Sequence, residues 1–217
     1  SALRRGVAAA VIAGIVVSSG IPAYADRWDI ANGDITVKAG DAEGTNKVSQ
    51  GGTIDKDDTD TVITGESDKH TVTIDTSKGD VNVTFDDLKI DVSGKAEVDG
   101  SGKAEVDSSG KTEGDGSGKT EVDGSGDGPA QESKAAVTVR GDHDATIELD
   151  GKNELKSGGG SAGLEKNDHE SSGKLTIKDD KGKDGSLTAE GGDGGAGIGG
   201  GYESGAGNIE ITGGTVK

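Results

Sequence analysis

Residues 185–217 read GSLTAEGGDGGAGIGGGYESGAGNIEITGGTVK, and they combine short alternating segments of apolar and polar residues with dense glycine. The alternation covers residues 186–189 and 208–212. Glycine loses more backbone entropy on folding than any other residue, so a chain places many glycines where positive φ angles or close backbone approaches require them. A stack of short strands joined by tight turns has that requirement at every corner. The stretch therefore predicts a stacked β structure, a β-solenoid.

The composition of the whole chain fits a narrow stack. Of 217 residues, 41 are glycine and 29% are hydrophobic, and the formal net charge is −18. Low hydrophobicity with high net charge is typical of disorder, but a regular period of two is not. A solenoid accommodates both features, because each coil buries only a few aliphatic side chains. The excess of acids argues against a nucleic-acid partner, and the lack of cysteine excludes thiolate metal sites and cysteine nucleophiles.

Residues 1–25 are predicted to be a secretory signal peptide. Arg4 and Arg5 form a positive start, an apolar run extends to Ile21, and an A-Y-A cleavage site ends at Ala25. The apolar run is shorter than the roughly 20 residues that a membrane-spanning helix needs. We therefore expect a secreted, extracellular protein with no membrane span in the mature chain.

Strand patterns occur in two parts of the mature chain, which we expect to be the two parts of one solenoid, 26–93 and 134–217. Each alternating segment is rich in Thr, Val and Ile and is bounded by Gly, Asp, Asn or Ser. The polar segment 40–60 is expected to be a loop. The clearest alternating segments are 34–38, 70–75, 80–85, 88–92, 136–140, 145–150, 175–177 and 186–189.

Residues 94–133 differ from both flanking parts. From Ser93 an octapeptide recurs as SGKAEVDG, SGKAEVDS, SGKTEGDG and SGKTEVDG. A repeat this short, with one valine at most, is typical of a low-complexity, disordered insert. The alternative is an array that binds cations, because Asp123 and Asp127 are spaced as at the start of a calcium loop. Lys134 occupies the position that should supply a bidentate Glu, which argues against such a loop.

Few residues are candidates for a binding site. A sugar ring usually packs on an aromatic side chain, and Trp28 and Tyr202 are the candidates for that contact. For Trp28 the alternative is a cap on the end of the stack. Asp142 and Asp144, with His143 between them, are candidates for a metal site. No cofactor is expected, with Ca²⁺ as the alternative.

No pattern in the sequence indicates catalysis. The motifs G-x-S-x-G and H-E-x-x-H do not occur. Polysaccharide lyases and hydrolases use carboxylates, but among 41 acidic residues no pair stands out. Threonines such as Thr71 and Thr73 are reminiscent of ice-binding solenoids, although their T-x-T pattern does not recur from coil to coil. We expect no enzyme activity, with a lyase, a hydrolase and an ice-binding protein as less favoured alternatives.

Two motifs carry a resemblance to a known family. The run GGAGIGGG at 194–201, followed by GNIEITGGTV at 207–216, resembles a repeat of large secreted proteins of Gram-positive bacteria labelled carbohydrate-binding-domain-containing. The segments HTVTIDTSKGDVNVTFDDLKIDVSGK, ATIELDGKNELKSGGGSAGLEK and LTIKDDKGKDGSLTAEGG look like preceding coils of the same family. The resemblance implies a right-handed β-helix-like fold, a secreted or cell-surface location and a role in carbohydrate binding or adhesion.

Together these features predict a non-catalytic module of a bacterial protein, an adhesin or glycan binder. Its expected partners are glycans or a host or cell-wall surface. The alternative function is a purely structural stalk that displays another domain. Because the repeat pattern is interrupted at Lys217, we expect further coils and a wall-attachment region beyond it.

Overall fold

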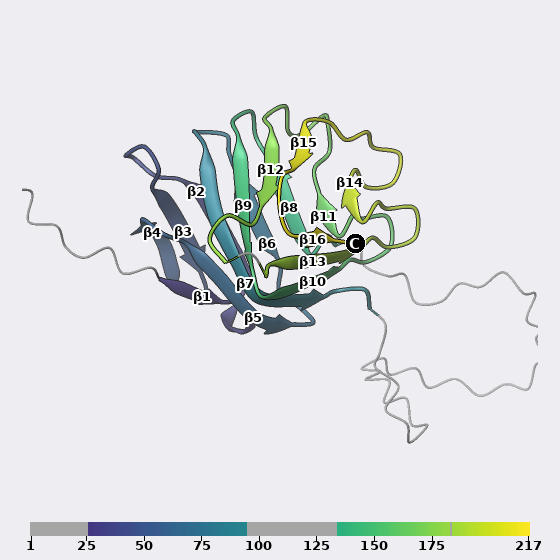
Figure 1. The fold of residues 1–217 in the computed structure, drawn as a ribbon, viewed down its shortest axis with the longest axis horizontal. Coiled ribbons are helices and arrows are strands. Elements are labelled where there is room, and N and C mark those ends of the chain that lie inside the picture. Colours follow the sequence, from purple (N-terminus) through teal and green to yellow (C-terminus); the bar gives the residue numbers. More distant parts are fainter. Residues whose placement is uncertain (1–25, 95–133, 183) are drawn as a thin grey trace, which may run out of the picture.

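The computed structural model describes residues 26–94, 134–182 and 184–217, and these residues form two packed β-sheets (Figure 1). Within these ranges there is no α-helix, only a short 3-10 turn, η1 (Ile30–Asn32). The prediction of an all-β fold is thus confirmed. The predicted signal peptide and the octapeptide insert, with Asp123 and Asp127, lie outside the described residues.

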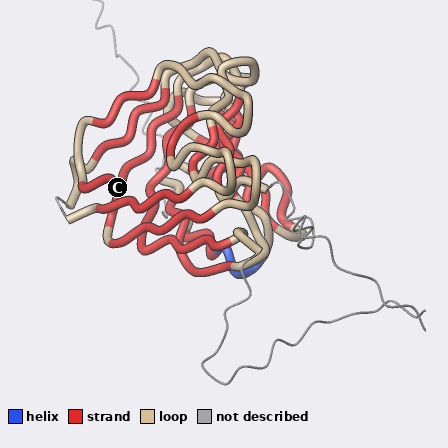
Figure 2. The backbone as a smooth tube through the Cα atoms, turned by 90° about the vertical axis from the view of Figure 1, so that its right-hand side faces the viewer, coloured by secondary structure: helices blue, strands red, loops and turns tan. Residues whose placement is uncertain are grey.

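The first sheet has nine strands, is parallel throughout and is strongly curled into a half-barrel (Figures 1 and 2). Its main path runs β15-β12-β9-β7-β10-β13-β16, and β5 pairs with β7 and β1 with β5. The strands are β1 (Arg27–Asp29), β5 (Val62–Ser67), β7 (Val81–Asp91), β9 (Ala145–Asp150), β10 (Lys152–Lys156), β12 (Leu175–Lys178), β13 (Ser186–Glu190), β15 (Ile209–Ile211) and β16 (Thr215–Val216).

A bend in the long strand β7 explains the curl. The part of β7 before Asp87 pairs with β9 and the part after it pairs with β10. Asp87 adopts a φ of 50°, a left-handed conformation that Asp tolerates better than most residues. Gly151 stands at the matching position between β9 and β10 with a φ of 60°, and the next N–H, of Lys152, donates to Asp87 Oδ1 at 2.9 Å. Neighbouring strands therefore turn at the same place, which curls the sheet.

The second sheet has seven strands in the order β14-β11-β8-β6-β2-β3-β4 and is mixed. Strands β2, β6, β8, β11 and β14 pair in parallel, whereas β3 pairs antiparallel with β2 and β4. The bounds are β2 (Ile35–Ala39), β3 (Asn46–Gln50), β4 (Thr53–Asp58), β6 (Val72–Asp75), β8 (Val137–Arg140), β11 (Leu164–Glu165) and β14 (Ile198–Gly199).

The expectation that residues 40–60 form a loop is wrong, because β3 and β4 make a hairpin there. Inward-facing Asn46 and Val48 are buried, and the other face carries charged side chains that pair across the hairpin, such as Lys47 with Asp57 at 2.8 Å. The hairpin pairs with an existing sheet edge at β2 and buries Val48 in the core, and its cross-strand pairs of opposite charge add a little to its stability.

The core lies between the two sheets and consists of the inward side chains of alternating strand positions. They are almost all aliphatic, with Phe85 the largest fully buried side chain. The inward residues of the central strands are Ile35, Val37, Val72, Ile74, Val81, Val83, Phe85, Leu88, Ile90, Val137, Val139, Ala145, Ile147, Leu149, Leu155, Leu164, Leu175, Ile177 and Leu187. The outward positions between them are left to threonines and charged residues.

The chain visits the sheets in a repeating order. One strand in the second sheet is followed by two in the first sheet, as β8-β9-β10, then β11-β12-β13, then β14-β15-β16. Equivalent strands lie side by side in register, for example Val137 with Leu164 and Leu164 with Ile198. Strand β8, the first after the insert, pairs directly with β6, so the segments on both sides of the insert belong to the same two sheets.

Candidate functional site

The most complete candidate site is a groove of about 380 Å³ on the outer face of the first sheet. Its floor is made of two rows of outward side chains on β7, β9 and β12. The first row places Asn82 beside Thr146 and Thr146 beside Thr176. The second row, two residues further along each strand, is Thr84, Glu148 and Lys178. The volume lies within the range of about 300–1,000 Å³ that is typical of small-molecule sites.

Three loop segments line the groove above its floor: residues 59–61, which precede β5, Lys181, in the turn after β12, and Gly44, between β2 and β3. An ion pair of 3.2 Å between Lys181 Nζ and Asp60 Oδ1 joins the first two segments. Segments that are 121 residues apart in the chain therefore meet at this groove.

Glu148 is the carboxylate at the floor, and its side chain is only 5% exposed. Its Oε1 atom accepts hydrogen bonds from the backbone N–H groups of Asp180, at 2.6 Å, and Lys181, at 2.7 Å. Its Oε2 atom makes no hydrogen bond within the described part of the chain, and Lys178 Nζ lies 3.5 Å from it. Lys178 is closer to Asp180, at 2.9 Å, and this hydrogen bond, with the nearby carboxylates, raises the pKa of Lys178.

The lining is suited to binding a polyol by hydrogen bonds. Threonine hydroxyls both donate and accept, the Asn82 side chain offers both functions, and Glu148 adds a carboxylate acceptor whose Oε2 atom makes no hydrogen bond among the described residues. None of the described lining residues is aromatic, so the contact that sequence analysis expected from Trp28 or Tyr202 is not made in this groove.

Trp28 lies in β1, packed into the core with 7% of its surface exposed. Its indole N–H donates to Asp58 Oδ2 at 2.8 Å, and Lys56 Nζ stands 5.6 Å from the ring centroid, a cation–π distance. The side chain therefore joins β1 to the terminal strand β4 of the second sheet. This arrangement leaves little ring surface for a sugar and is of the kind expected for a cap.

Tyr202 is 63% exposed on the loop between β14 and β15. A Cβ atom at Gly194, which has a φ of 79°, would lie 2.6 Å from Tyr202 Cδ2, so the ring packs closely on this glycine. The Tyr202 N–H donates to Gly160 O at 2.7 Å. Buried Lys166 fixes the end of the loop by donating to Gly207 O at 2.9 Å, and burial lowers the pKa of its amine. Tyr202 is thus an anchored, exposed aromatic ring. It follows β14, at one end of the second sheet, whereas Trp28 contacts β4, at the other end of that sheet.

Asp142 and Asp144 lie in a turn of the chain, where their carboxylates accept hydrogen bonds. Asp142 Oδ1 accepts from the Ser172 hydroxyl at 2.8 Å, and Asp144 Oδ1 accepts from the Lys174 N–H at 2.8 Å. Asp80 accepts in the same way from the Asp144 N–H at 3.0 Å, which makes a ladder of carboxylates along the corner before β7, β9 and β12. Within residues 26–94, 134–182 and 184–217, no three metal-ligating side chains gather in a group that could hold a metal ion.

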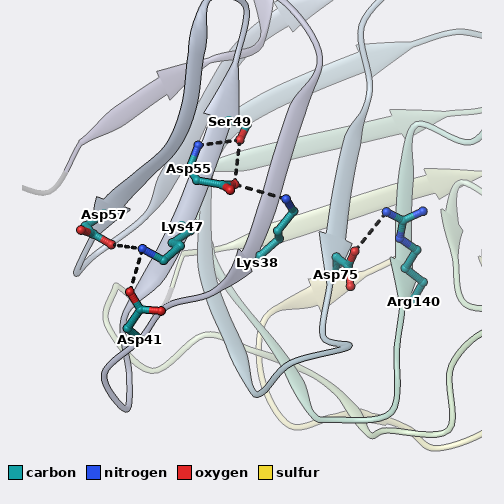
Figure 3. Close-up of polar contacts among 8 residues, drawn as sticks. All are labelled: Lys38, Asp41, Lys47, Ser49, Asp55, Asp57, Asp75 and Arg140. Atoms are coloured by element: carbon teal, nitrogen blue, oxygen red, sulfur yellow. Dashed lines mark hydrogen bonds and ion pairs between the residues drawn. The ribbon is translucent and has the colours of Figure 1, made fainter.

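The outer face of the second sheet carries a row of paired charges (Figure 3). Lys47 lies between Asp57, at 2.8 Å, and Asp41, at 3.0 Å, and these hydrogen bonds raise the pKa of its amine. The hydrogen bond from Lys38 at 3.2 Å lowers the pKa of Asp55. Because these groups satisfy one another on an exposed surface, they stabilise the fold by little and offer few free groups to a ligand.

The ion pair between Asp75 and Arg140 in this row predicts that the protein loses stability in acid. Burial alone would raise the pKa of Asp75, but the hydroxyl and N–H of Ser77, with Arg140 at 3.0 Å, hold that pKa below its usual value. A carboxyl with a lowered folded-state pKa stabilises the fold above its unfolded-state pKa, and this stabilisation is lost as the pH falls through the folded-state value. The free energy of unfolding, measured by urea denaturation, should therefore fall below about pH 4. Arg140→Gln should show a smaller fall, and an equal fall in both proteins would contradict this assignment.

The groove residues Asp60, Glu148, Lys178 and Lys181 were not predicted from the sequence. One signal could have indicated them: ATIELD at 145–150 and LTIKDD at 175–180 have the same alternation, so Thr146 aligns with Thr176 and Glu148 with Lys178. Superposing the two segments predicts an outward pair of threonines and a pair of opposite charges on adjacent strands. The loop segment at 59–61 has no such signal.

Comparisons with known proteins add no relative. The chain matches no family model, and neither the curated proteins nor the solved structures contain a significant match. In the described ranges, no helix has the length and apolar character needed to cross a membrane.

Proposed function

We propose that the chain is a non-catalytic β-solenoid module that binds carbohydrate through the groove on β7, β9 and β12. The solenoid would be a right-handed parallel β-helix with three strands in each coil. The repeating strand order and the in-register parallel pairs support this architecture. The handedness follows from the general rule that crossover connections between parallel strands are right-handed.

The observation that carries the binding proposal is the lining of the groove. Two rows of hydroxyl, amide and charged groups from three adjacent strands face one open volume of 380 Å³. Orientation of a sugar in a site depends on a few placed polar groups, and parallel strands place them at a regular spacing. Tyr202, exposed and anchored, is a second, separate candidate contact for a longer glycan.

The geometry favours binding over hydrolysis of a glycan. A hydrolase needs one carboxyl group that gives up a proton to the leaving oxygen and a second that acts as nucleophile or base. Glu148 and Asp180 both contact the ammonium of Lys178, and Glu148 Oε1 already accepts two backbone N–H groups. This arrangement suits a fixed hydrogen-bond acceptor.

A secreted or cell-surface location remains a prediction from residues 1–25.

A purely structural stalk is the second candidate function. The observation in its favour is the continuous row of parallel strands from β5 to β15. At the corner before these strands, Asp80 and Asp144 accept hydrogen bonds from the backbone just before the next strand. A stalk would present no ligand specificity, so binding measurements separate the two functions.

The test compares two matched pairs of threonines. The full chain is screened against a broad glycan panel, and the strongest ligand is titrated against Thr146→Val/Thr176→Val and against Thr36→Val/Thr73→Val. The second pair lies on adjacent strands on the outer face of the other sheet. Loss of two hydrogen bonds in the groove should weaken binding roughly tenfold, and the control pair should leave it unchanged.

Three results would redirect this proposal. Equal effects of both variants would remove the groove as the site, and loss of binding in Tyr202→Ala alone would move the site to the loop after β14. Folded protein that binds no glycan would support the stalk. Circular dichroism before each titration establishes that the variants are folded.

A further inference from the structure

The buried Oε2 oxygen of Glu148 is a feature that a neutral polyol does not fully explain. The carboxylate is buried, its Oε1 is doubly hydrogen bonded, and its Oε2 has no hydrogen bond within the described residues. A buried carboxylate oxygen without a donor is unfavourable, and a cationic donor satisfies it better than a neutral one.

Lys178 only partly compensates the charge on Glu148 Oε2. Its ammonium lies 2.9 Å from Asp180 Oδ2 and 3.5 Å from Glu148 Oε2, so one cation is shared by two carboxylates and stands closer to the exposed one. The other lysine at the groove, Lys181, is paired with Asp60 at 3.2 Å.

The charged groups that line the groove are two carboxylates, of Asp60 and Glu148, and two ammonium groups, of Lys178 and Lys181. Asp180, outside the lining, holds Lys178 closer to itself than to Glu148, and the whole chain has a formal net charge of −18. This environment attracts a further positive charge and repels an acidic sugar.

We propose that the groove binds a glycan that carries a free, protonated amine, an unacetylated amino sugar. The amine donates to Glu148 Oε2 in competition with Lys178, and the sugar hydroxyls bond to Thr146 and Thr176. This inference rests on the proposed carbohydrate-binding function, because it names the class of sugar for the same groove.

The probes are oligomers of glucosamine and of N-acetylglucosamine of equal length, titrated into the full chain by calorimetry. Acetylation removes the positive charge of the amine and leaves the hydroxyl groups of the sugar unchanged. The wild-type protein should prefer the amine form by roughly tenfold, as expected for a hydrogen bond between charged groups. The preference should fall with rising salt.

Two substitutions should change this preference in opposite directions. Glu148→Gln removes the carboxylate and should abolish the preference, whereas Glu154→Gln, on the exposed side of β10, removes the same charge outside the groove and should retain it. Lys178→Met removes the competing ammonium and should strengthen binding of the amine form severalfold. Lys38→Met, an ion-paired lysine on the other sheet, should have no effect.

The outcomes are separable from those of the proposed function. Equal affinity for both oligomers would overturn this inference and leave a glycan-binding groove. Weaker binding of the amine form by Lys178→Met would overturn it even if Glu148→Gln failed to fold. An equal loss of preference in Glu154→Gln and Glu148→Gln would show non-specific attraction to an acidic protein and would also overturn it. Binding of neither oligomer by the folded chain would count against the proposed function itself.

Discussion

Asn153→Ala is expected to lower the free energy of unfolding by about 3 kcal/mol or more. Asn153 is 1% exposed and bonds to three backbone groups within the core. Its Oδ1 accepts from the Leu88 N–H at 3.0 Å, and its Nδ2 donates to Asp150 O at 3.0 Å and to Ser186 O at 3.1 Å. Each buried group left without its partner costs about 1–3 kcal/mol.

The position of Asn153 explains why the effect should be large. Leu88 belongs to β7 and Ser186 to β13, the two strands on either side of β10. One amide group therefore satisfies backbone groups of β7, β9 and β13 at the corner where the sheet curls.

Urea denaturation followed by circular dichroism measures this loss. Glu154→Ala is the matched control, because it changes the next residue of the same strand on the exposed side, and such a substitution should alter the free energy of unfolding by no more than about 0.5 kcal/mol. Similar losses for the two variants would contradict the role assigned to the amide.

Phe85→Ala should lower the free energy of unfolding by about 3–5 kcal/mol, the usual cost of removing a buried ring. Phe85 is fully buried, and its nearest cross-strand neighbours are Ile63 on β5 and Leu149 on β9. Alanine would leave a cavity between these strands, and the paired backbones on both sides limit how far the walls can move in.

The same denaturation experiment with Phe85→Leu separates the size of the cavity from the loss of aromatic character. Leucine fills much of the volume, so its loss should be smaller than that of alanine by more than 1 kcal/mol. A loss below about 1 kcal/mol in Phe85→Ala would mean that the ring lies in a region that readily repacks, and the close packing described for β5, β7 and β9 would then be wrong.

Strand existence followed from local patterns. The alternations at 34–38, 80–85 and 145–150 became β2, the first half of β7 and β9, because a period of two places one set of side chains on the core side whatever the partner strand is. Glycine and Asp at the boundaries marked corners correctly, for instance at Gly151 with its φ of 60°.

Hairpin β3–β4 was missed because its alternation is nearly all polar. Only Val48 marks the inner face of β3, and β4 exposes Ile54 while burying Asp58 at its end. A strand of this kind forms because β2 offers an edge to pair with, and opposite charges that meet across the hairpin, such as Lys47 and Asp57, add a little to its stability. The edge at β2 lies outside residues 40–60 and cannot be detected from that segment alone.

The sequence by itself determined that this chain is an all-β protein with a thin aliphatic core, glycine-marked corners and threonine or charge on the outer positions. It did so because burial on one face of a strand is recorded residue by residue. Only the tertiary structure decided which outer positions meet. Thr146 and Thr176 are neighbours through strand register, and Asp60 reaches Lys181 across 121 residues. The alternation marks Thr146 and Thr176 as outward positions, but it does not show that the loop segment at residues 59–61 and Lys181 stand beside them, and this is why the candidate site emerged from the fold.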